Sequence, residues 1–187
     1  FDRQRLLAAS SIKPEHFDEF QRLCITLVHG SAFQFVLTEI YSQPYTDVLI
    51  AQLTLLLQQN QLASASLVLD ESIMGIPELE TQLIELRHTA AVIHILAGST
   101  WFTPARWAEL NLRRDTLAHE CQAKLVCWLT PEQSRDCANY AIDLWAWRSG
   151  VYAFEETTDA PIQVIPQLDV GFSNQSQLDR ARRIGQL

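Results

Sequence analysis

The chain has 187 residues, of which 48% are hydrophobic and 19% are charged. That length fits one ordinary domain, and that composition supports a buried core rather than disorder. Acidic residues number 22 against 14 basic ones, and the formal net charge is −8. A phosphate-binding surface needs clustered Lys and Arg, whereas Lys13 and Lys124 are the only lysines. We therefore expect no nucleic-acid partner, and we interpret the pair Arg113 and Arg114 as part of a solvated helix face.

Cysteine usage and hydropathy indicate in which cellular compartment the protein is expected. The four cysteines form no C-x-x-C pair and have no histidine at metal-finger spacing. Cys24 and Cys137 fall on apolar helix faces and Cys127 lies in an apolar run, so we expect buried free thiols and no metal site. No apolar run approaches the ~20 residues that a membrane-spanning helix requires, and no signal peptide opens the chain. We expect a cytoplasmic protein, and we interpret Phe1 at its start as a sign of a longer chain.

Helices and strands are expected to alternate. An amphipathic helix over 14–29 has Pro14 in its first turn and Gly30 as its C-cap. Thr103-Pro104 and Thr130-Pro131 each combine an N-cap residue with a following proline, which indicates two further helix starts. Apolar periodicity and β-branched runs predict the remaining elements. The expected strands are 33–40, 65–70, 91–96, 125–129 and 151–154, and the later helices are 45–61, 77–90, 103–121 and 130–149.

This alternation predicts an α/β fold. Strands that are separated by helices need crossover connections, so the five strands should form a mostly parallel sheet with helices on both faces, a three-layer sandwich. The continuous apolar character of 91–96 and 125–129 agrees, because parallel strands are buried on both sides. The helix over 45–61 is apolar on most of its circumference and should be heavily buried. We expect the α/β domain to span 1–156, with 157–187 forming a linker or strap and the start of a C-terminal helix.

Candidate site residues lie where strands end, because ligands of open parallel sheets bind at the carboxyl ends of the strands. These positions are 41–43, 70–71, 98–100, 130 and 155–156. Asp70 and Glu71 follow an apolar strand in the manner of a Walker B segment, in which one acid holds magnesium through water and the next polarises the attacking water. Apolar strands that end in acids are common, however, so we expect no metal or cofactor here. Ser99 is a weak nucleophile candidate beside Gly98, and His94 reads as a core histidine with a satisfied hydrogen bond.

Two tryptophans mark a candidate interaction surface. Trp145 and Trp147 are two positions apart on an expected helix, which separates them by about 200° at 3.6 residues per turn. One indole should pack on the sheet, while the other covers a neighbouring segment or an exposed partner surface. Packing within the chain is the simpler interpretation. Trp145, Trp147 and Arg148 are nevertheless the residues that we predict for protein interaction.

Three segments carry a resemblance to known proteins. They are residues 110–117 (LNLRRDTL), 125–129 (LVCWL) and 143–152 (DLWAWRSGVY). Together they resemble a stretch of bacterial, often cyanobacterial, multidomain proteins in which an N-terminal α/β region precedes tetratricopeptide repeats. The order of strands and the Asp-Leu-Trp-x-Trp-Arg-Ser-Gly-Val pattern also resemble the core of AAA/STAND-type NTPases. The likeness covers 107–154 at motif level and the rest of the chain only in topology.

The resemblance implies that strand 33–40 and the following turn occupy the position of a phosphate-binding loop. A P-loop needs G-x-x-x-x-G-K-[ST] there, but residues 39–47 contain neither Gly nor Lys. The resemblance then implies a degenerate P-loop NTPase-like module without a cofactor. We expect a non-catalytic regulatory or interaction domain of a larger bacterial signalling or scaffold protein, which binds a protein partner or other domains of its own chain. The alternatives are an enzyme or nucleotide binder that uses the strand-end cleft, through Asp70, Glu71 and Ser99, and a homo-oligomer.

Overall fold

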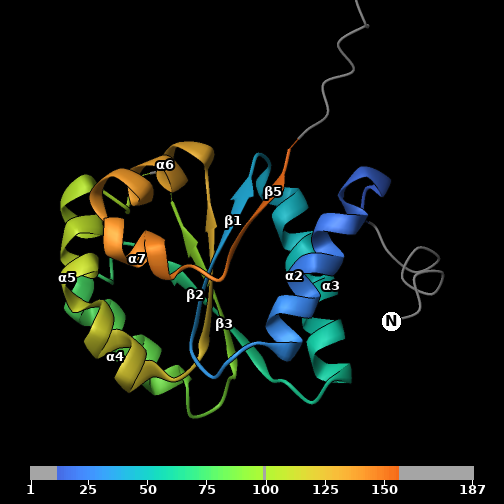
Figure 1. The fold of residues 1–187 in the computed structure, drawn as a ribbon, viewed down its shortest axis with the longest axis horizontal. Helices are drawn as coiled ribbons and strands as arrows, with labels where there is room; N and C mark the ends of the chain where they lie inside the picture. The colour runs from blue at the N-terminus through green and yellow to red at the C-terminus, as the bar shows by residue number, and fades with distance from the viewer. Residues whose placement is uncertain (1–11, 99, 156–187) are drawn as a thin grey trace, which may run out of the picture. The chain divides into compact units, whose positions relative to one another are not determined.

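The computed structural model describes residues 12–98 and 100–155, which form an α/β sandwich (Figure 1). Five strands make one sheet in the order β2-β3-β4-β1-β5, and every pairing is parallel. The predicted fold class is confirmed. The strands are β1 (Gln34–Ile40), β2 (Ser64–Leu69), β3 (Val92–Ala97), β4 (Lys124–Leu129) and β5 (Gly150–Phe154). The helices are η1 (Pro14–His16), α2 (Phe17–His29), α3 (Gln43–Gln59), α4 (Ile76–Leu86), α5 (Pro104–Cys121), α6 (Pro131–Tyr140) and α7 (Ile142–Trp147).

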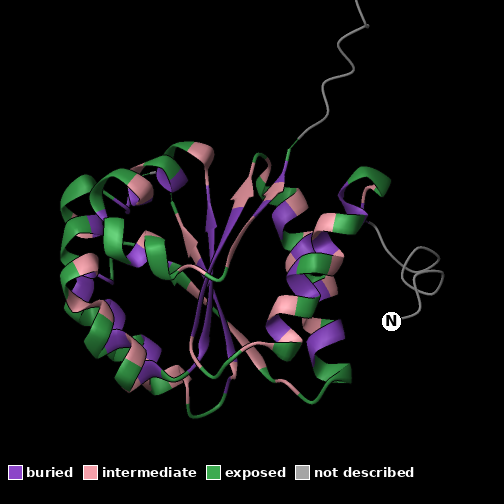
Figure 2. Ribbon diagram, viewed as in Figure 1, coloured by how far each residue is buried: buried purple, intermediate pink, exposed green. Residues whose placement is uncertain are grey.

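The sheet separates two apolar cores. Successive strand residues point to opposite faces, so Val36 and Trp128 pack under α2 and α3, while Leu37 and Cys127 pack under α4 to α7. Figure 2 shows the buried surfaces of both helix layers turned toward the sheet. All six residues of β4 are buried, as expected for the central strand of a parallel sheet. No helix in the described part of the chain is long and apolar enough to cross a membrane.

Two sequence predictions need correction. The helix expected over 130–149 is two helices, because the chain breaks at Ala141 (φ −126°, ψ 55°). The side-chain oxygen of Asn111 accepts a hydrogen bond from the backbone N–H of Leu144 at 2.9 Å, which ties the second helix to α5. Helix α3 is less buried than its composition predicts, since Leu55 is 54% exposed. In the first case, a contact from a distant helix overrides the local pattern.

The prediction of buried free thiols is confirmed. All four cysteines, Cys24, Cys121, Cys127 and Cys137, are free and buried. Burial raises the pKa of the Cys24 and Cys137 thiols to about 12. Both thiols are therefore uncharged packing groups in the folded chain. The linker predicted over 157–187 lies outside the described residues.

Candidate functional site

The strand order divides the predicted strand-end residues into separate groups. Because β2 and β3 are neighbours, Asp70 and Glu71 lie beside Gly98 and Thr100. In contrast, Tyr41 follows β1, and β3 and β4 lie between β1 and β2. Three strand spacings separate these two strand ends by about 14 Å at ~4.8 Å per spacing. The residues expected at one crevice therefore do not share a site.

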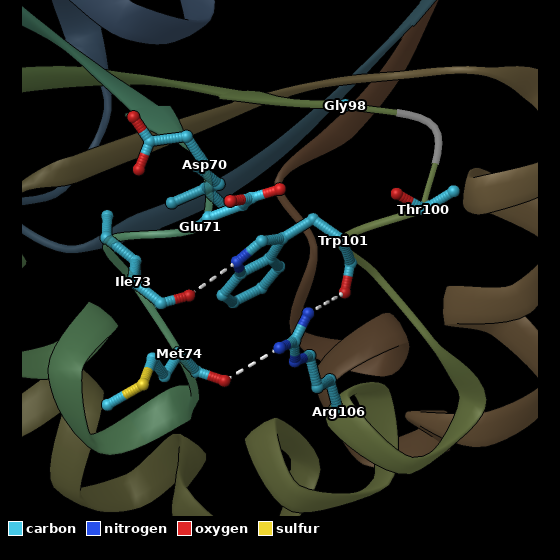
Figure 3. A pocket seen from close by; sticks show the side chains of 9 residues that line it. Asp70, Glu71, Ile73, Met74, Gly98, Thr100, Trp101 and Arg106 are labelled. Carbon is cyan, nitrogen blue, oxygen red and sulfur yellow. Dashed lines mark hydrogen bonds between the residues drawn. The ribbon is translucent and has the colours of Figure 1, made fainter.

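A cleft of about 550 Å³ opens at the carboxyl ends of β2 and β3 (Figure 3). Its apolar part is formed by Leu69, Ile73 and Trp101, and Asp70 and Glu71 lie on its rim. Ser99, the predicted nucleophile, is outside the described residues. Among the described residues, no group of three or more His, Cys, Asp or Glu side chains could hold a metal ion.

Hydrogen bonds and a cation–π contact from Arg106 fix the wall of this cleft. The guanidinium of Arg106 donates to the carbonyl oxygens of Trp101 at 2.6 Å and Met74 at 2.7 Å, and lies 4.5 Å from the centre of the Trp101 ring. The Trp101 indole N–H in turn donates to the carbonyl oxygen of Ile73 at 2.8 Å. Figure 3 shows these bonds joining the β2–α4 loop to the start of α5. Much of the bonding capacity of Arg106 thus serves to hold two loops together.

The carboxylate of Asp70 is likewise engaged within its own loop. It accepts hydrogen bonds from the backbone N–H of Ser72 at 2.8 Å and from the Ser72 hydroxyl at 2.5 Å. These bonds lower the pKa of Asp70 below its ordinary value, because they stabilise the charged form. The arrangement is an Asx turn, in which an aspartate shapes the loop that follows it.

The connection after β1, where the resemblance would place a phosphate-binding loop, is a tight turn. Only Tyr41 and Ser42 connect β1 to α3. Beside this turn, His16 Nδ1 lies 2.9 Å from the hydroxyl of Tyr45, and His16 Nε2 lies 2.6 Å from the backbone oxygen of Glu155. A carbonyl oxygen can only accept, so His16 Nε2 carries hydrogen. His16 therefore joins η1 to the first turn of α3 and to the residue that follows β5.

The core histidine differs partly from the prediction. His94 Nδ1 accepts a hydrogen bond from the Trp128 indole at 3.3 Å, which satisfies one ring nitrogen. The other nitrogen, Nε2, is buried without a hydrogen-bond partner in the described part of the chain. Burial lowers the pKa of His94 to about 4, so its ring is neutral at physiological pH. The sequence pattern shows the apolar strand but not the missing second partner.

The predicted interaction residues lie on α7 and directly after it. Trp145 is half-buried against the core below α7, whereas Trp147 is 45% exposed. A guanidinium covers each indole, since Arg148 lies 4.1 Å from the Trp145 ring centre and Arg114 lies 5.5 Å from that of Trp147. Arg114 is thus half-buried between two helices rather than on a solvated face, which corrects the sequence interpretation.

Several site residues were missed because their roles depend on tertiary contacts. Arg106 and Trp101 brace the cleft, and Asn111 and Arg114 anchor α7, but each pairs with a partner that is distant in sequence or on another element. The Thr103-Pro104 start of α5 gave the only local signal, because it places Arg106 in the first helical turn.

Comparisons with known proteins add little to this geometry. No family model and no curated protein matches the chain. A solved structure of DnaI is similar at 11% sequence identity with a TM-score of 0.45, over 83% of this chain and 92% of that chain. At that distance the similarity assigns neither a family nor a function. The resemblance to AAA/STAND-type NTPases and the link to tetratricopeptide repeats remain predictions.

Proposed function

We propose that this chain is a non-catalytic protein-interaction module of a larger protein, and that its contact surface is centred on Trp147 of α7. The observation that carries the proposal is the exposed indole of Trp147, held under the guanidinium of Arg114. Tryptophan and arginine are the residues most enriched at the energetic centres of protein interfaces. A large apolar group that remains accessible on a fixed helix is well suited to that role.

The surface is preorganised before any partner arrives. Asn111 donates to Asp143 at 3.2 Å and accepts from the backbone of Leu144, so two bonds fix the start of α7 on α5. Arg114 lies 3.5 Å from Asp143 and also covers Trp147, so the indole is held by the same contacts that fix α7 on α5. Binding then costs little side-chain entropy, because the contact residues are already ordered.

Arg148 adds a charge to this surface. Its guanidinium stacks on Trp145 and donates to the Trp145 carbonyl oxygen at 2.6 Å. Within the described ranges, no carboxylate forms an ion pair with Arg148. A partner that presents an apolar side chain to Trp147 and a carboxylate to Arg148 would match both features.

The strand-end geometry supports a role without nucleotide hydrolysis. The turn at Tyr41 and Ser42 carries no glycine and leaves little backbone to surround a phosphate, whereas a P-loop cradles phosphates with successive backbone N–H groups. Asp70 shapes its own loop through Ser72. The resemblance to degenerate NTPase-like domains agrees with this proposal.

A site-specific photocrosslinker tests the interaction surface. p-Benzoylphenylalanine is placed at Trp147 in the full-length protein, and at Ile25 as a control on α2 in the opposite helix layer. Ile25 is 42% exposed against 45% for Trp147, so the two positions are matched in accessibility. A discrete adduct with another protein or another domain, formed only from position 147, supports the proposal. Equal labelling from both positions, or none from position 147, contradicts it.

The cleft beside Asp70 and Glu71 favours a second candidate function, a small-ligand site or an enzyme. Its volume of about 550 Å³ falls within the ordinary range of ligand pockets. Thermal unfolding with ATP, GTP and magnesium distinguishes the two functions, because a ligand that binds the folded state raises the melting temperature. Saturable stabilisation by a nucleotide that is lost in Asp70→Ala would favour the second candidate over the interaction module.

A further inference from the structure

Strand β2 presents an open hydrogen-bonding edge. Within residues 12–98 and 100–155 it is the last strand of the sheet on one side and pairs only with β3. The backbone oxygen of Ala63 accepts from Val92 of β3, so the alternating residues Ser64, Ser66 and Val68 direct their N–H and C=O groups outward. Val68 is 59% exposed although it lies within the strand. This edge has the geometry needed to accept another strand.

The opposite edge of the sheet differs. In β5 the side chains of Tyr152 and Phe154 are buried, and the Tyr152 hydroxyl is bonded to Thr26 of α2 at 2.6 Å. Natural edge strands are usually blunted by lysine, proline, a bulge or a covering element. Strand β2 contains neither lysine nor proline, and its register with β3 is continuous from Ser64 to Leu69. By these criteria β2 is an unguarded edge.

Strand β2 itself and most of α3 carry no charged side chain, although Glu78 of α4 lines the groove beside β2. Positions 48–69, which cover most of α3 and all of β2, contain no Asp, Glu, Lys, Arg or His, although the chain as a whole carries a net charge of −8. Leu55 on α3 and Val68 on β2 are the large exposed apolar side chains of this segment. Two copies of so acidic a chain repel each other over most of their surfaces. They meet without like-charge contacts along this uncharged segment.

We propose that two copies of the chain associate through β2, edge to edge and antiparallel, and so form one continuous ten-stranded sheet. A two-fold axis perpendicular to the sheet keeps each face continuous, so outward-directed residues must pair with outward-directed residues. Of the registers that meet this condition, the one that pairs all three outward-directed residues of the strand places Ser66 opposite Ser66 of the partner subunit and Ser64 opposite Val68 of the partner subunit. Each such pair exchanges two backbone hydrogen bonds.

A groove beside β2 accommodates the added strand. It has a volume of about 420 Å³ and runs between the outer side of β2 and α4, with Leu67, Ile73 and Thr81 among its lining residues. Strand alternation points Ala65 and Leu67 to the α4 face of the sheet. In the proposed register, Ala65 of the partner subunit lies opposite Leu67, and Leu67 of the partner subunit lies opposite Ala65, both on that same face beside the groove. Apolar burial then accompanies the backbone hydrogen bonds.

Solution mass provides the first test. Light scattering with size-exclusion chromatography should give twice 21.3 kDa for the chain at high concentration and 21.3 kDa for the Val68→Lys variant. Ile25→Lys, at an exposed position on α2, is the control and should keep the dimer mass. Circular dichroism checks that all three proteins are folded. A wild-type mass of 21.3 kDa at all concentrations, or a dimer that survives Val68→Lys, overturns the proposal.

Disulfide trapping tests the register. A hydrogen-bonded antiparallel pair places its Cα atoms about 5.5 Å apart, within the range that a disulfide spans. Ser66→Cys should therefore form a covalent dimer under mild oxidation, and the four native cysteines give little background because they are buried. Val68→Cys is the matched control, since its two copies lie about 13 Å apart along the strands. Trapping at position 68 but not at 66 contradicts this pairing. Neither experiment depends on the surface at Trp147, so the two proposals can fail independently.

Discussion

The buried histidine His94 makes stability depend on pH in a predictable way. Its ring is 1% exposed on β3 and is hydrogen-bonded through Nδ1 to Trp128. In the unfolded chain a histidine has a pKa near 6.5, whereas burial lowers the pKa of His94 to about 4 in the folded chain. Between these values the unfolded state binds a proton that the folded state does not. His94 therefore destabilises the fold as the pH falls from about 6.5 to 4.

The magnitude follows from proton linkage. Each pH unit between the two pKa values lowers the free energy of unfolding by about 1.4 kcal/mol. From pH 7.5 to pH 5 about 1.5 of these units are crossed, which gives a loss of about 2 kcal/mol from this one residue. His94→Asn removes the titration. Its amide oxygen can still accept a hydrogen bond in the region of the Trp128 indole.

Urea unfolding of the wild type and His94→Asn at several pH values measures this effect. Titration of the other groups is common to both proteins, so the difference between their unfolding free energies isolates His94. The wild type should lose about 2 kcal/mol relative to the variant between pH 7.5 and pH 5. If the difference stays constant within about 0.5 kcal/mol, a precision typical of such comparisons, His94 is solvated in the native state and its assignment to the core is wrong.

Three further predictions concern packing, capping and thiol reactivity. Trp107→Ala removes a fully buried indole that stacks on Phe102 at 4.1 Å between ring centres, so chemical denaturation should show a loss of about 3–5 kcal/mol. Thr130→Ala breaks the capping box with Gln133 at the start of α6, and the same assay should show a loss of about 1 kcal/mol. The Cys24 thiol should react with a chromogenic disulfide only after denaturant is added, because it is buried with a raised pKa; rapid reaction of the native protein would contradict its burial.

Local sequence patterns predicted most of the fold. The Thr-Pro starts of α5 and α6, the apolar runs of β3 and β4, and the proline in the first turn before α2 depend on neighbours within a few residues, and each is found in the structure. The break at Ala141 could not be predicted, because no glycine or proline marks it. The break occurs where the backbone N–H of Leu144 donates a hydrogen bond to Asn111 of another helix, α5.

Only those parts of the candidate site that come from consecutive, adjacent strands could be predicted from the sequence. Asp70, Glu71 and Gly98 lie together because their strands are consecutive in the chain and adjacent in the sheet. Tyr41 lies elsewhere because β1 pairs with β4 and β5, and pairing between distant segments leaves no local pattern. The role of Arg106 was hidden for the same reason, since it bonds to Met74 across 32 positions.

The insertion of β1 between β4 and β5 also governs when the sheet can be completed during synthesis. Val36 pairs with Val126, a separation of 126 − 36 = 90 positions, and Leu37 pairs with Val151, 151 − 37 = 114 positions later. Closing such long loops costs entropy that nearby contacts do not. On the ribosome, β1 must therefore wait unpaired until β4 and then β5 have emerged, whereas β2 and β3 can pair beforehand. A nascent chain that stalls before β5 leaves one side of β1 without its native partner, open to chaperones or aggregation.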